Sequence, residues 1–443
     1  MMTFDEFKKK AFDISAELGC EAAEVYFNDG ETFSVNVLGG ELDEYSVEHS
    51  FGLNLRVIYG GRAGYAYTEM LDDPRALVLR AVDNAKAVEN DDVMPMQGKC
   101  EYRQIAKPEC RASGLTPTEK IAYAEKLEKD LMAADPRVIR TMYCAIQTTK
   151  STTRLHNTLG LEADNTEELS ASILCPIMQQ DGVVKDSFIV KTGNELFDTD
   201  AMIKEVVRKV ADQFGASPVP SGEYSIIMQN EAMANMLAAF SPMFSADNAQ
   251  KGMSLLAGRE GETIAADCVT LMDDPFYKEY PRAFDAEGVP SVTKEVISKG
   301  VLTTLLHNLQ TAAKAGTAST SNAGRGASGP VTVAPSNFYI VPGETDYDSL
   351  LGRMGSGVVI TDVSGLHAGL NPVSGDFSLI AKGQLVEGGR VVRAVDQITV
   401  AGNFLTMMKN IAVVGSDLKF GMPGMSRFGS PSLLIEKLMV SGE

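Results

Sequence analysis

The stretch QNEAMANMLAAF, residues 229–240, is the segment around which we read the second half of the chain. Asn230 is a favourable helix N-cap, because its side-chain oxygen accepts a hydrogen bond from a free backbone N–H of the first turn. Apolar residues then recur at helical spacing on one face: Met233, Met236, Leu237 and Phe240. The pattern predicts a capped helix whose apolar face packs on a core.

The polar positions of the same stretch have the spacing of a His-Glu-x-x-x-His metal motif. Asn230 and Asn235 stand where the two histidines would be, and Glu231 keeps the position of the glutamate. An asparagine amide lacks the imidazole nitrogen or anionic oxygen that zinc prefers. We therefore interpret Asn230, Glu231 and Asn235 as a degenerate motif and predict no catalytic residue, no metal ligand and no cofactor site in this chain.

Upstream of this helix, GASPVPSG at 215–222 is the clearest linker, because it is rich in Gly, Pro and Ser. Before it, capping boxes at Thr3–Glu6 and Thr116–Glu119 and a proline after Asp73 predict three helix starts. A fourth helix is expected near 200–214. Alternating segments predict antiparallel strands, with turns at Asn28-Asp29-Gly30, 39–40 and 60–61. Residues 1–220 therefore read as an α+β domain with helices lying on antiparallel strands.

Downstream, the chain reads as a second domain, residues 221–443, that is β-rich and mixed. Hairpins are expected at 289–306, turning at 298–300, and at 383–395, turning at 387–389. Short helices are expected near 346–354 and 404–411. The small-residue run 315–330 is expected to be a loop, either functional or mobile. A chain of 443 residues is too long for one hydrophobic core, which agrees with two domains.

Composition limits the classes of partner. The chain carries 59 acidic and 40 basic residues, a formal charge of -19, and no run of Lys or Arg longer than Lys8-Lys9-Lys10. We expect no direct contact with nucleic acid or with an anionic membrane. The six cysteines form no C-x-x-C pair, and no apolar run approaches the length of a membrane span. These features predict reduced thiols and a cytoplasmic location.

Other motifs are weak. GRGASG at 324–329 matches G-x-G-x-x-G, but a strand rather than a helix is expected after it, so we interpret the match as coincidental. The four histidines are too far apart for a local ligand pair. The acidic clusters at 273–274 and 285–287 are interpreted as turn residues in preference to a cation site. The polar turn at 371–378 either lines a cleft or is simply tight.

Several segments of the second half together resemble the TldD/PmbA family, also labelled modulator of DNA gyrase. The resemblance extends weakly to the first half, through GLNLRV at 52–57 and GRAG at 61–64. In the second half it is carried by segments at 246–258, 273–275, 284–290, 371–378, 398–404 and 415–418. A set of motifs in one order is more specific than any single motif.

The resemblance implies one of two branches. TldD-like members carry His-Glu-x-x-x-His and a downstream cysteine and act as zinc-dependent peptidases, whereas PmbA-like (TldE-like) members lack these ligands and pair with TldD. This chain is similar to the second branch, because Asn230 and Asn235 replace the histidines and FGMPGMSR at 420–427 has no cysteine. Without a metal, Glu231 has no metal-bound water to deprotonate.

The resemblance thus implies a non-catalytic subunit of a TldD–TldE type zinc metallopeptidase that processes unfolded peptides. A TldD-like paralogue would be the partner, in a heterodimer or higher complex, and would hold the zinc. A homodimer is expected when the chain is alone. Two alternatives remain open: a gyrase-linked regulatory or binding protein, and a stand-alone peptidase that uses an unrecognised site.

Overall fold

The computed structural model describes residues 2–89, 94–107, 109–194, 197–326, 328–422 and 424–443. The first half is built on one seven-stranded sheet in which neighbouring strands are antiparallel. Its order is β3-β2-β1-β4-β5-β6, with β7 also paired to β5. The strands are β1 (Ala22–Leu38), β2 (Glu41–Tyr59), β3 (Arg62–Thr68), β4 (Val138–Asn157), β5 (Glu162–Gln180), β6 (Val183–Asp186) and β7 (Ile189–Gly193).

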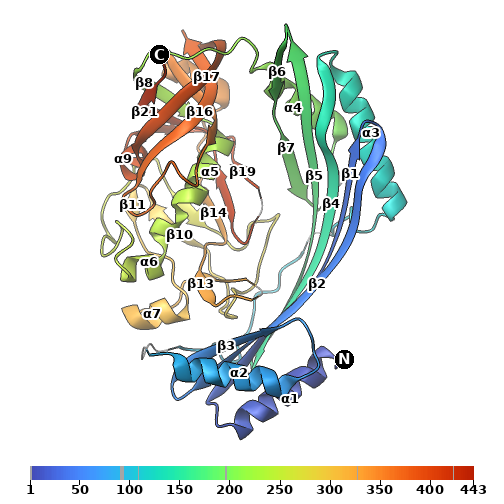
Figure 1. The fold of residues 1–443 in the computed structure, drawn as a ribbon. Coiled ribbons are helices and arrows are strands. Elements are labelled where there is room, and N and C mark those ends of the chain that lie inside the picture. Colours follow the sequence, from blue (N-terminus) through green and yellow to red (C-terminus); the bar gives the residue numbers. More distant parts are fainter. Residues whose placement is uncertain (1, 90–93, 108, 195–196, 327, 423) are drawn as a thin grey trace.

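Four helices cover parts of this sheet: α1 (Phe4–Glu17), α2 (Pro74–Ala87), α3 (Pro117–Ala134) and α4 (Thr199–Ala211). The long strands form a curved wall in Figure 1, with α1 and α2 at one end and α3 along the outer side. Both predicted capping boxes are formed, at Thr3 and Thr116, and Asp73 caps α2 ahead of its proline. The capping residues therefore predicted these three helix starts correctly. The structure confirms the predicted α+β class.

The expected turn at Asn28-Asp29-Gly30 is wrong, because β1 runs through it without interruption. Gly30 pairs with Ser50 of β2 on one side and with Ser151 of β4 on the other. A strand with partners on both edges has its backbone groups satisfied in the extended form, and this outweighs the local preference of Asn, Asp and Gly for turns.

The second half contains a closed ring of strands. The sheet order is β17-β16-β15-β8-β21-β18, and an added β17–β21 pairing closes five of these strands on themselves. Closure removes the free sheet edges of those five strands. The strands are β8 (Gly222–Met228), β15 (Gly357–Ser364), β16 (Asp376–Glu387), β17 (Arg390–Asn403), β18 (Ile411–Val414) and β21 (Leu433–Ser441).

A second six-stranded sheet, order β11-β10-β9-β14-β20-β19, lies in the same half, with a two-stranded β12–β13 hairpin. Its strands are β9 (Leu271–Asp273), β10 (Lys294–Ser298), β11 (Val301–Leu302), β14 (Asn337–Ile340), β19 (Lys419–Phe420) and β20 (Arg427–Ser430). The hairpin is β12 (Ala323–Arg325) and β13 (Val331–Val333). The run 315–330 is therefore not wholly a loop as expected, since β12 lies within it.

Helix α5 (Asn230–Phe240) is packed into the hydrophobic core of this half. Met233, Leu237 and Phe240 are fully buried, as the helical periodicity predicted. The Phe240 ring stacks on Phe404 with centroids 4.5 Å apart. The remaining helical segments are η1 (Ser241–Phe244), α6 (Ala246–Gln250), α7 (Leu309–Ala315), α8 (Tyr347–Met354) and α9 (Phe404–Lys409). The last two agree with the short helices expected near 346–354 and 404–411.

The segment 215–222 lies between the two halves. The strands of the first sheet end at Gly193 and those of the other sheets begin at Gly222. The Arg393 guanidinium donates to the carbonyls of Ser217 and Pro218, at 2.6 and 2.8 Å. The segment is thus fastened to the C-terminal half, and the domain boundary at 220 stays a prediction. Among the described residues, no helix combines the length and apolarity needed to cross a membrane.

Candidate functional site

Asn230 does not cap α5 as expected. The N-cap position is Gln229, without a side-chain cap bond, and the Asn230 backbone N–H donates to Ser432 Oγ at 3.2 Å. The Asn230 side-chain oxygen still accepts from a first-turn N–H, that of Glu231, at 2.7 Å, while its amide nitrogen donates to Asp417, to its carbonyl at 2.9 Å and its carboxylate at 3.1 Å. The hydroxyl of Ser432, between β20 and β21, accepts from the first N–H of the helix, and Asn230 connects α5 to the segment before β19.

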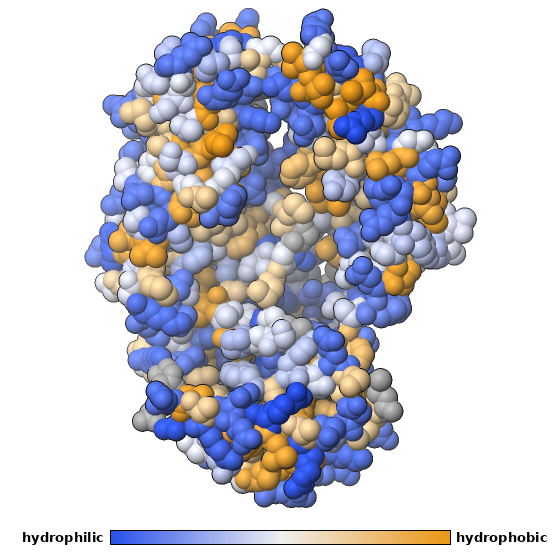
Figure 2. Space-filling model, viewed as in Figure 1, coloured by the Kyte–Doolittle hydropathy of each residue, from blue (hydrophilic) through white to orange (hydrophobic). Residues whose placement is uncertain are grey.

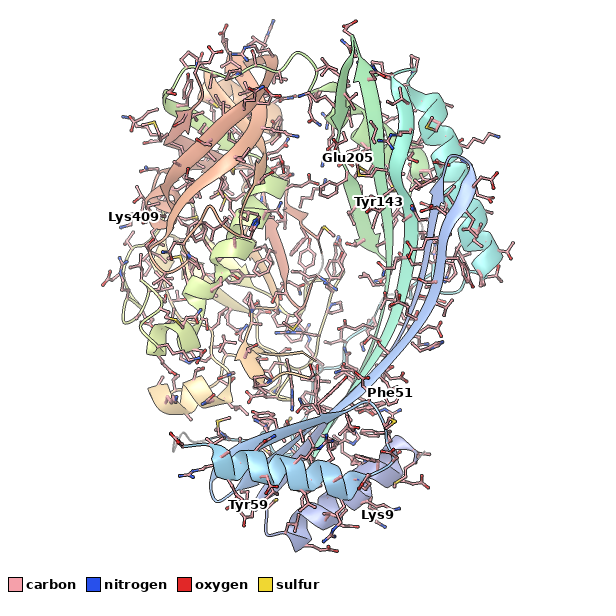
Figure 3. The ribbon with its side chains drawn as sticks, in the orientation of Figure 1. Lys9, Phe51, Tyr59, Tyr143, Glu205 and Lys409 are labelled. Carbon is pink, nitrogen blue, oxygen red and sulfur yellow. The ribbon has the colours of Figure 1, made fainter. Side chains whose placement is uncertain are left out.

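Glu231 lies at the boundary between the two halves of the molecule. Its carboxylate pairs with Lys209 of α4 and with Lys419 of β19. Lys419 also pairs with Glu205 of α4 at 2.9 Å, and Glu205 pairs with Lys191 of β7 at 2.7 Å. We call these five residues the interdomain charge cluster. Glu205 is labelled in Figure 3.

The interdomain charge cluster is partly withdrawn from water, with its side chains 24% to 31% exposed. Burial by itself would raise the pKa of Glu205, but hydrogen bonds from Lys191 and Lys419 outweigh it and lower the pKa to about 2. Burial also opposes ionisation of Glu231, and the charges of Lys209 and Lys419 lower its pKa nevertheless. Both carboxylates are therefore anionic at neutral pH.

Asn235 lies one turn further along α5 and is exposed. It faces the chain after β19, since a Cβ added to Gly421 would lie 3.5 Å from its side-chain oxygen. The structure thus brings the Asn235 end of the degenerate motif next to residues 420–427, the stretch in which a cysteine is absent.

The donors on this helix do not fit a zinc ion. Asn230 and Asn235 present neutral amides, and the anionic Glu231 is already paired with two ammonium groups. A dication next to Glu231 would meet Lys209 and Lys419 at close range, where like charges repel strongly. Within the described residues, no group of three or more His, Cys, Asp and Glu is arranged to hold a metal ion.

A second set of charges, which the sequence did not reveal, also joins the two halves. Arg56 of β2 pairs with Glu24 of β1 at 3.0 Å and with Glu287 at 3.5 Å. Arg325 of β12 pairs with the same Glu24 at 2.9 Å and donates to Asn54 at 2.6 Å. We call Glu24, Arg56, Glu287 and Arg325 the buried ion network, because their side chains are at most 2% exposed.

The acidic clusters of the sequence are therefore more than turn residues, although Asp285 does accept from the backbone N–H groups of Glu287 and Val289. Asp273 is fully buried, pairs with Lys294 at 2.7 Å and accepts from Ser336 Oγ at 2.6 Å. G-x-G-x-x-G at 324–329 is followed by strand β13 and not by a helix, which supports its interpretation as coincidental; Ala327 lies outside the described residues.

The turn at 371–378 is tight. Asn371 accepts from the backbone N–H of Val373 at 2.9 Å, and Gly375 has a positive φ of 81°. Such a φ suits glycine, which has no Cβ. Among the histidines, His307 is buried next to α7 and burial lowers its pKa, whereas His156 bonds Lys8 and Asp164. His156 therefore has structural partners, whereas the buried Nδ1 of His307 has no hydrogen-bond partner among the described residues.

A cavity of about 440 Å³ opens between the two halves. Figure 2 shows the surface hollowed in the region where they meet. One wall is β5 from Thr166 to Leu169, and the facing wall is the loop 279–282 with residues 424–427. The cavity falls within the range of small-ligand sites, roughly 300–1,000 Å³. No local sequence pattern indicates this cavity, because its walls come from distant segments.

Comparison with known proteins agrees with this architecture. Residues 221–442 match the family model described as PmbA/TldA metallopeptidase C-terminal domain, and residues 23–85 match PmbA/TldA metallopeptidase domain 1. A Methanothermobacter thermautotrophicus protein described as a metalloprotease is 25% identical, over 95% of this chain and 96% of its own.

Two solved structures have the same fold. A Thermotoga maritima protein described as a modulator of a DNA gyrase is 32% identical, with a TM-score of 0.90, and the match covers 99% of this chain and 100% of that one. TldE from Thermococcus kodakarensis has a TM-score of 0.88 at 22% identity, covering 98% and 100%.

The fold and the family-model match over residues 221–442 define a protein of the metallopeptidase-like class. More particularly, the chain belongs to the PmbA/TldD family. The resemblance seen in the sequence motifs is thereby confirmed.

Proposed function

We propose that this chain is a non-catalytic, TldE-like subunit of a zinc metallopeptidase that processes unfolded peptides. A TldD-like paralogue would supply the zinc and the water that attacks the peptide bond. This chain would supply part of the wall that holds the peptide. Glu231 carries the proposal, since the one acidic residue kept from the motif is paired with Lys209 and Lys419.

Peptide binding is supported by the inter-half cavity. Along β5, the partners on the side away from β4 are β7 from Ser170 to Leu174 and β6 from Ile177 to Gln180. Between Glu162 and Leu169, no described strand pairs with that side of β5 (Figure 1). Part of this segment, Thr166 to Leu169, lines the cavity. An extended peptide can hydrogen-bond such an edge through its main chain without a specific sequence. This suits unfolded substrates.

The test is to mix the purified chain with a TldD-like paralogue that carries His-Glu-x-x-x-His. We expect a stoichiometric complex on size-exclusion chromatography and a peptidase activity that chelators remove. The interface should be large, on the order of 2,000 Å², as is usual for permanent pairs. Separate elution at micromolar concentration, together with full activity of the paralogue alone, would contradict the subunit role.

The metal-free character of this chain has its own test. Elemental analysis of the purified chain should find no stoichiometric zinc, and the chain alone should not hydrolyse peptides. The physical reason is the amide donors at Asn230 and Asn235 and the two ammonium groups around Glu231. Stoichiometric zinc that is lost in Glu231→Ala would overturn this part of the proposal.

A further inference from the structure

An arginine in the inter-half cavity has an unusual setting. The Arg427 guanidinium lies over the Tyr280 ring, 4.0 Å from its centroid. Tyr280 in turn reaches across to the N-terminal half, where its hydroxyl lies 3.0 Å from Thr192 Oγ1 of β7. The stacking and this contact hold the flat face of Arg427 in place and leave its edge, which carries the N–H donors, directed away from the ring.

Arg427 has no ion-pair partner among the described residues. Within the described residues, its recorded hydrogen bond goes to the Gly424 carbonyl at 3.3 Å, and no carboxylate lies within 4.0 Å of the guanidinium. The side chain is partly buried, and burial lowers the pKa of this arginine. A cation taken out of water is costly unless an anion or several hydrogen bonds compensate it. The guanidinium is therefore suited to a bidentate carboxylate supplied by a ligand.

The other charged residues of the cavity restrict which kind of ligand can supply this carboxylate. Glu167 and Glu168 of β5 and Glu279 of the facing loop line the same cavity, and the chain has a net charge of -19. Lys107 and Arg282 also line it. The Lys107 ammonium is already bound to Asn165 and to the Thr166 carbonyl, the latter at 2.7 Å, and the Arg282 guanidinium donates to the Ser321 carbonyl at 3.4 Å. A simple anion is disfavoured by these acidic neighbours. A peptide that carries positively charged groups next to a carboxylate can pair with Arg427 and with the acidic residues of the cavity.

We propose that Arg427, on its Tyr280 platform, binds the C-terminal carboxylate of a peptide in this cavity. The proposal rests on the proposed function and adds a specificity to it: the subunit recognises free peptide ends. The peptide main chain would lie along the open side of β5, with basic side chains near Glu167, Glu168 or Glu279. A side-chain carboxylate has the same chemistry, so the experiment must separate the two sources.

Three fluorescein-labelled ten-residue peptides of Gly, Ser and two Lys provide the probes. The first ends in a free carboxylate, the second in an amide, and the third in an amide preceded by Glu. Fluorescence anisotropy with the full chain, and with its complex with the paralogue, measures binding. We expect the free acid to bind about tenfold or more tightly than both amides, since the second peptide lacks a carboxylate and the third carries it on a side chain instead of at the main-chain end.

Arg427→Gln should bind the free acid and the amides equally weakly, whereas the exposed Arg390→Gln should keep the wild-type preference. If Arg427→Gln is poorly folded by circular dichroism, Tyr280→Leu replaces it, because this change removes the platform. Equal binding of the first two peptides by the wild-type chain would overturn the proposal. So would tight binding of the third peptide, or no binding of any. Complex formation with the paralogue tests the subunit role separately. A failure of the carboxylate proposal can therefore be distinguished from a failure of the subunit role.

Discussion

Glu231 shows how one residue changes its role with its neighbours. In a metal motif a glutamate at this position would face a metal-bound water, but here two lysines from different halves of the molecule face it. The same carboxylate that would promote a reaction holds α5 against α4 and β19. At the residue scale, the observed contacts of this carboxylate are attachments between elements.

Removing this carboxylate should weaken the fold. In Glu231→Gln, Lys209 and Lys419 lose an anionic partner at positions that are 27% and 28% exposed. We expect a loss of about 1–2 kcal/mol of unfolding free energy, between the values for exposed and for buried pairs. Urea unfolding measures it. Glu223→Gln, in an exposed pair with Lys437, is the control and should change little. Equal effects of the two variants would contradict the structural role of Glu231.

Glu287 gives a prediction for pH dependence. Burial raises its pKa to about 7, although the charge of Arg56 acts in the opposite direction and Asp285 and Glu24 add to the rise. The unfolded carboxyl titrates near 4.5, so between pH 4.5 and 7 the folded state binds more protons than the unfolded state. The unfolding free energy should therefore fall as pH rises through this window, by about 3 kcal/mol from Glu287 alone.

Glu287→Gln should remove this contribution and flatten the pH dependence between pH 4.5 and 7. Its amide oxygen can still accept from the Leu309 N–H, which the carboxylate accepts at 2.8 Å. Denaturant unfolding at pH 5, 6, 7 and 8 compares the variant with the wild type. An unchanged slope in the variant would show that Glu287 does not titrate in this range.

At the scale of elements, close approach between helix and strand gives the sharpest prediction. A Cβ added at Gly64 of β3 would lie 1.9 Å from the Ala81 carbonyl of α2, an approach that no side chain tolerates. Gly64→Ala should therefore destabilise the fold by about 3 kcal/mol or more, because α2 must move off the sheet. Thermal unfolding measures this loss.

Gly352→Ala is the matched control for Gly64→Ala. Gly352 lies inside α8, and a Cβ there meets nothing within 4 Å. Alanine should be neutral or stabilise the helix by up to about 1 kcal/mol. A Gly64→Ala protein as stable as the control would mean that α2 does not pack on β3 as described.

Local patterns predicted the elements better than the contacts between them. The apolar face of α5 and the caps at Thr3 and Thr116 followed from spacing alone, since each depends on residues within one helix. Pairing from both sides overrode the turn expected near Gly30. Partners far apart in sequence could not be predicted: Arg56 and Glu287 are 231 positions apart, and Arg325 and Glu24 are 301 apart.

In the candidate site, too, local patterns were predicted better than contacts between distant segments. The spacing of Asn230, Glu231 and Asn235 predicted a degenerate motif, because a motif on one helix is local. Lys209 and Lys419, which give Glu231 its role, come from α4 and β19. The cavity around Arg427 likewise depends on how the two halves meet. The pattern of a single sequence does not show which distant segments come into contact, unless those segments share a recognisable period.

At the scale of the whole molecule, charge governs association. Two copies of a chain with a net charge of -19 repel each other when they approach. The repulsion reaches about 30 Å in 0.01 M salt but only about 10 Å in 0.1 M salt. A partner with less negative charge would not meet this barrier. Acidity therefore disfavours self-association at low salt and leaves hetero-association open.

We accordingly predict that the homodimer expected of the isolated chain tightens as salt rises. Between about 10 mM and 500 mM sodium chloride, its dissociation constant should fall, because screening reduces the repulsion between the two acidic copies while apolar contacts persist. Sedimentation equilibrium at several salt concentrations measures this constant. Adding the TldD-like paralogue at one equivalent should convert homodimer into hetero-complex at every salt concentration. Tighter self-association at low salt would instead indicate a homodimer held by charge pairs, and would contradict the prediction.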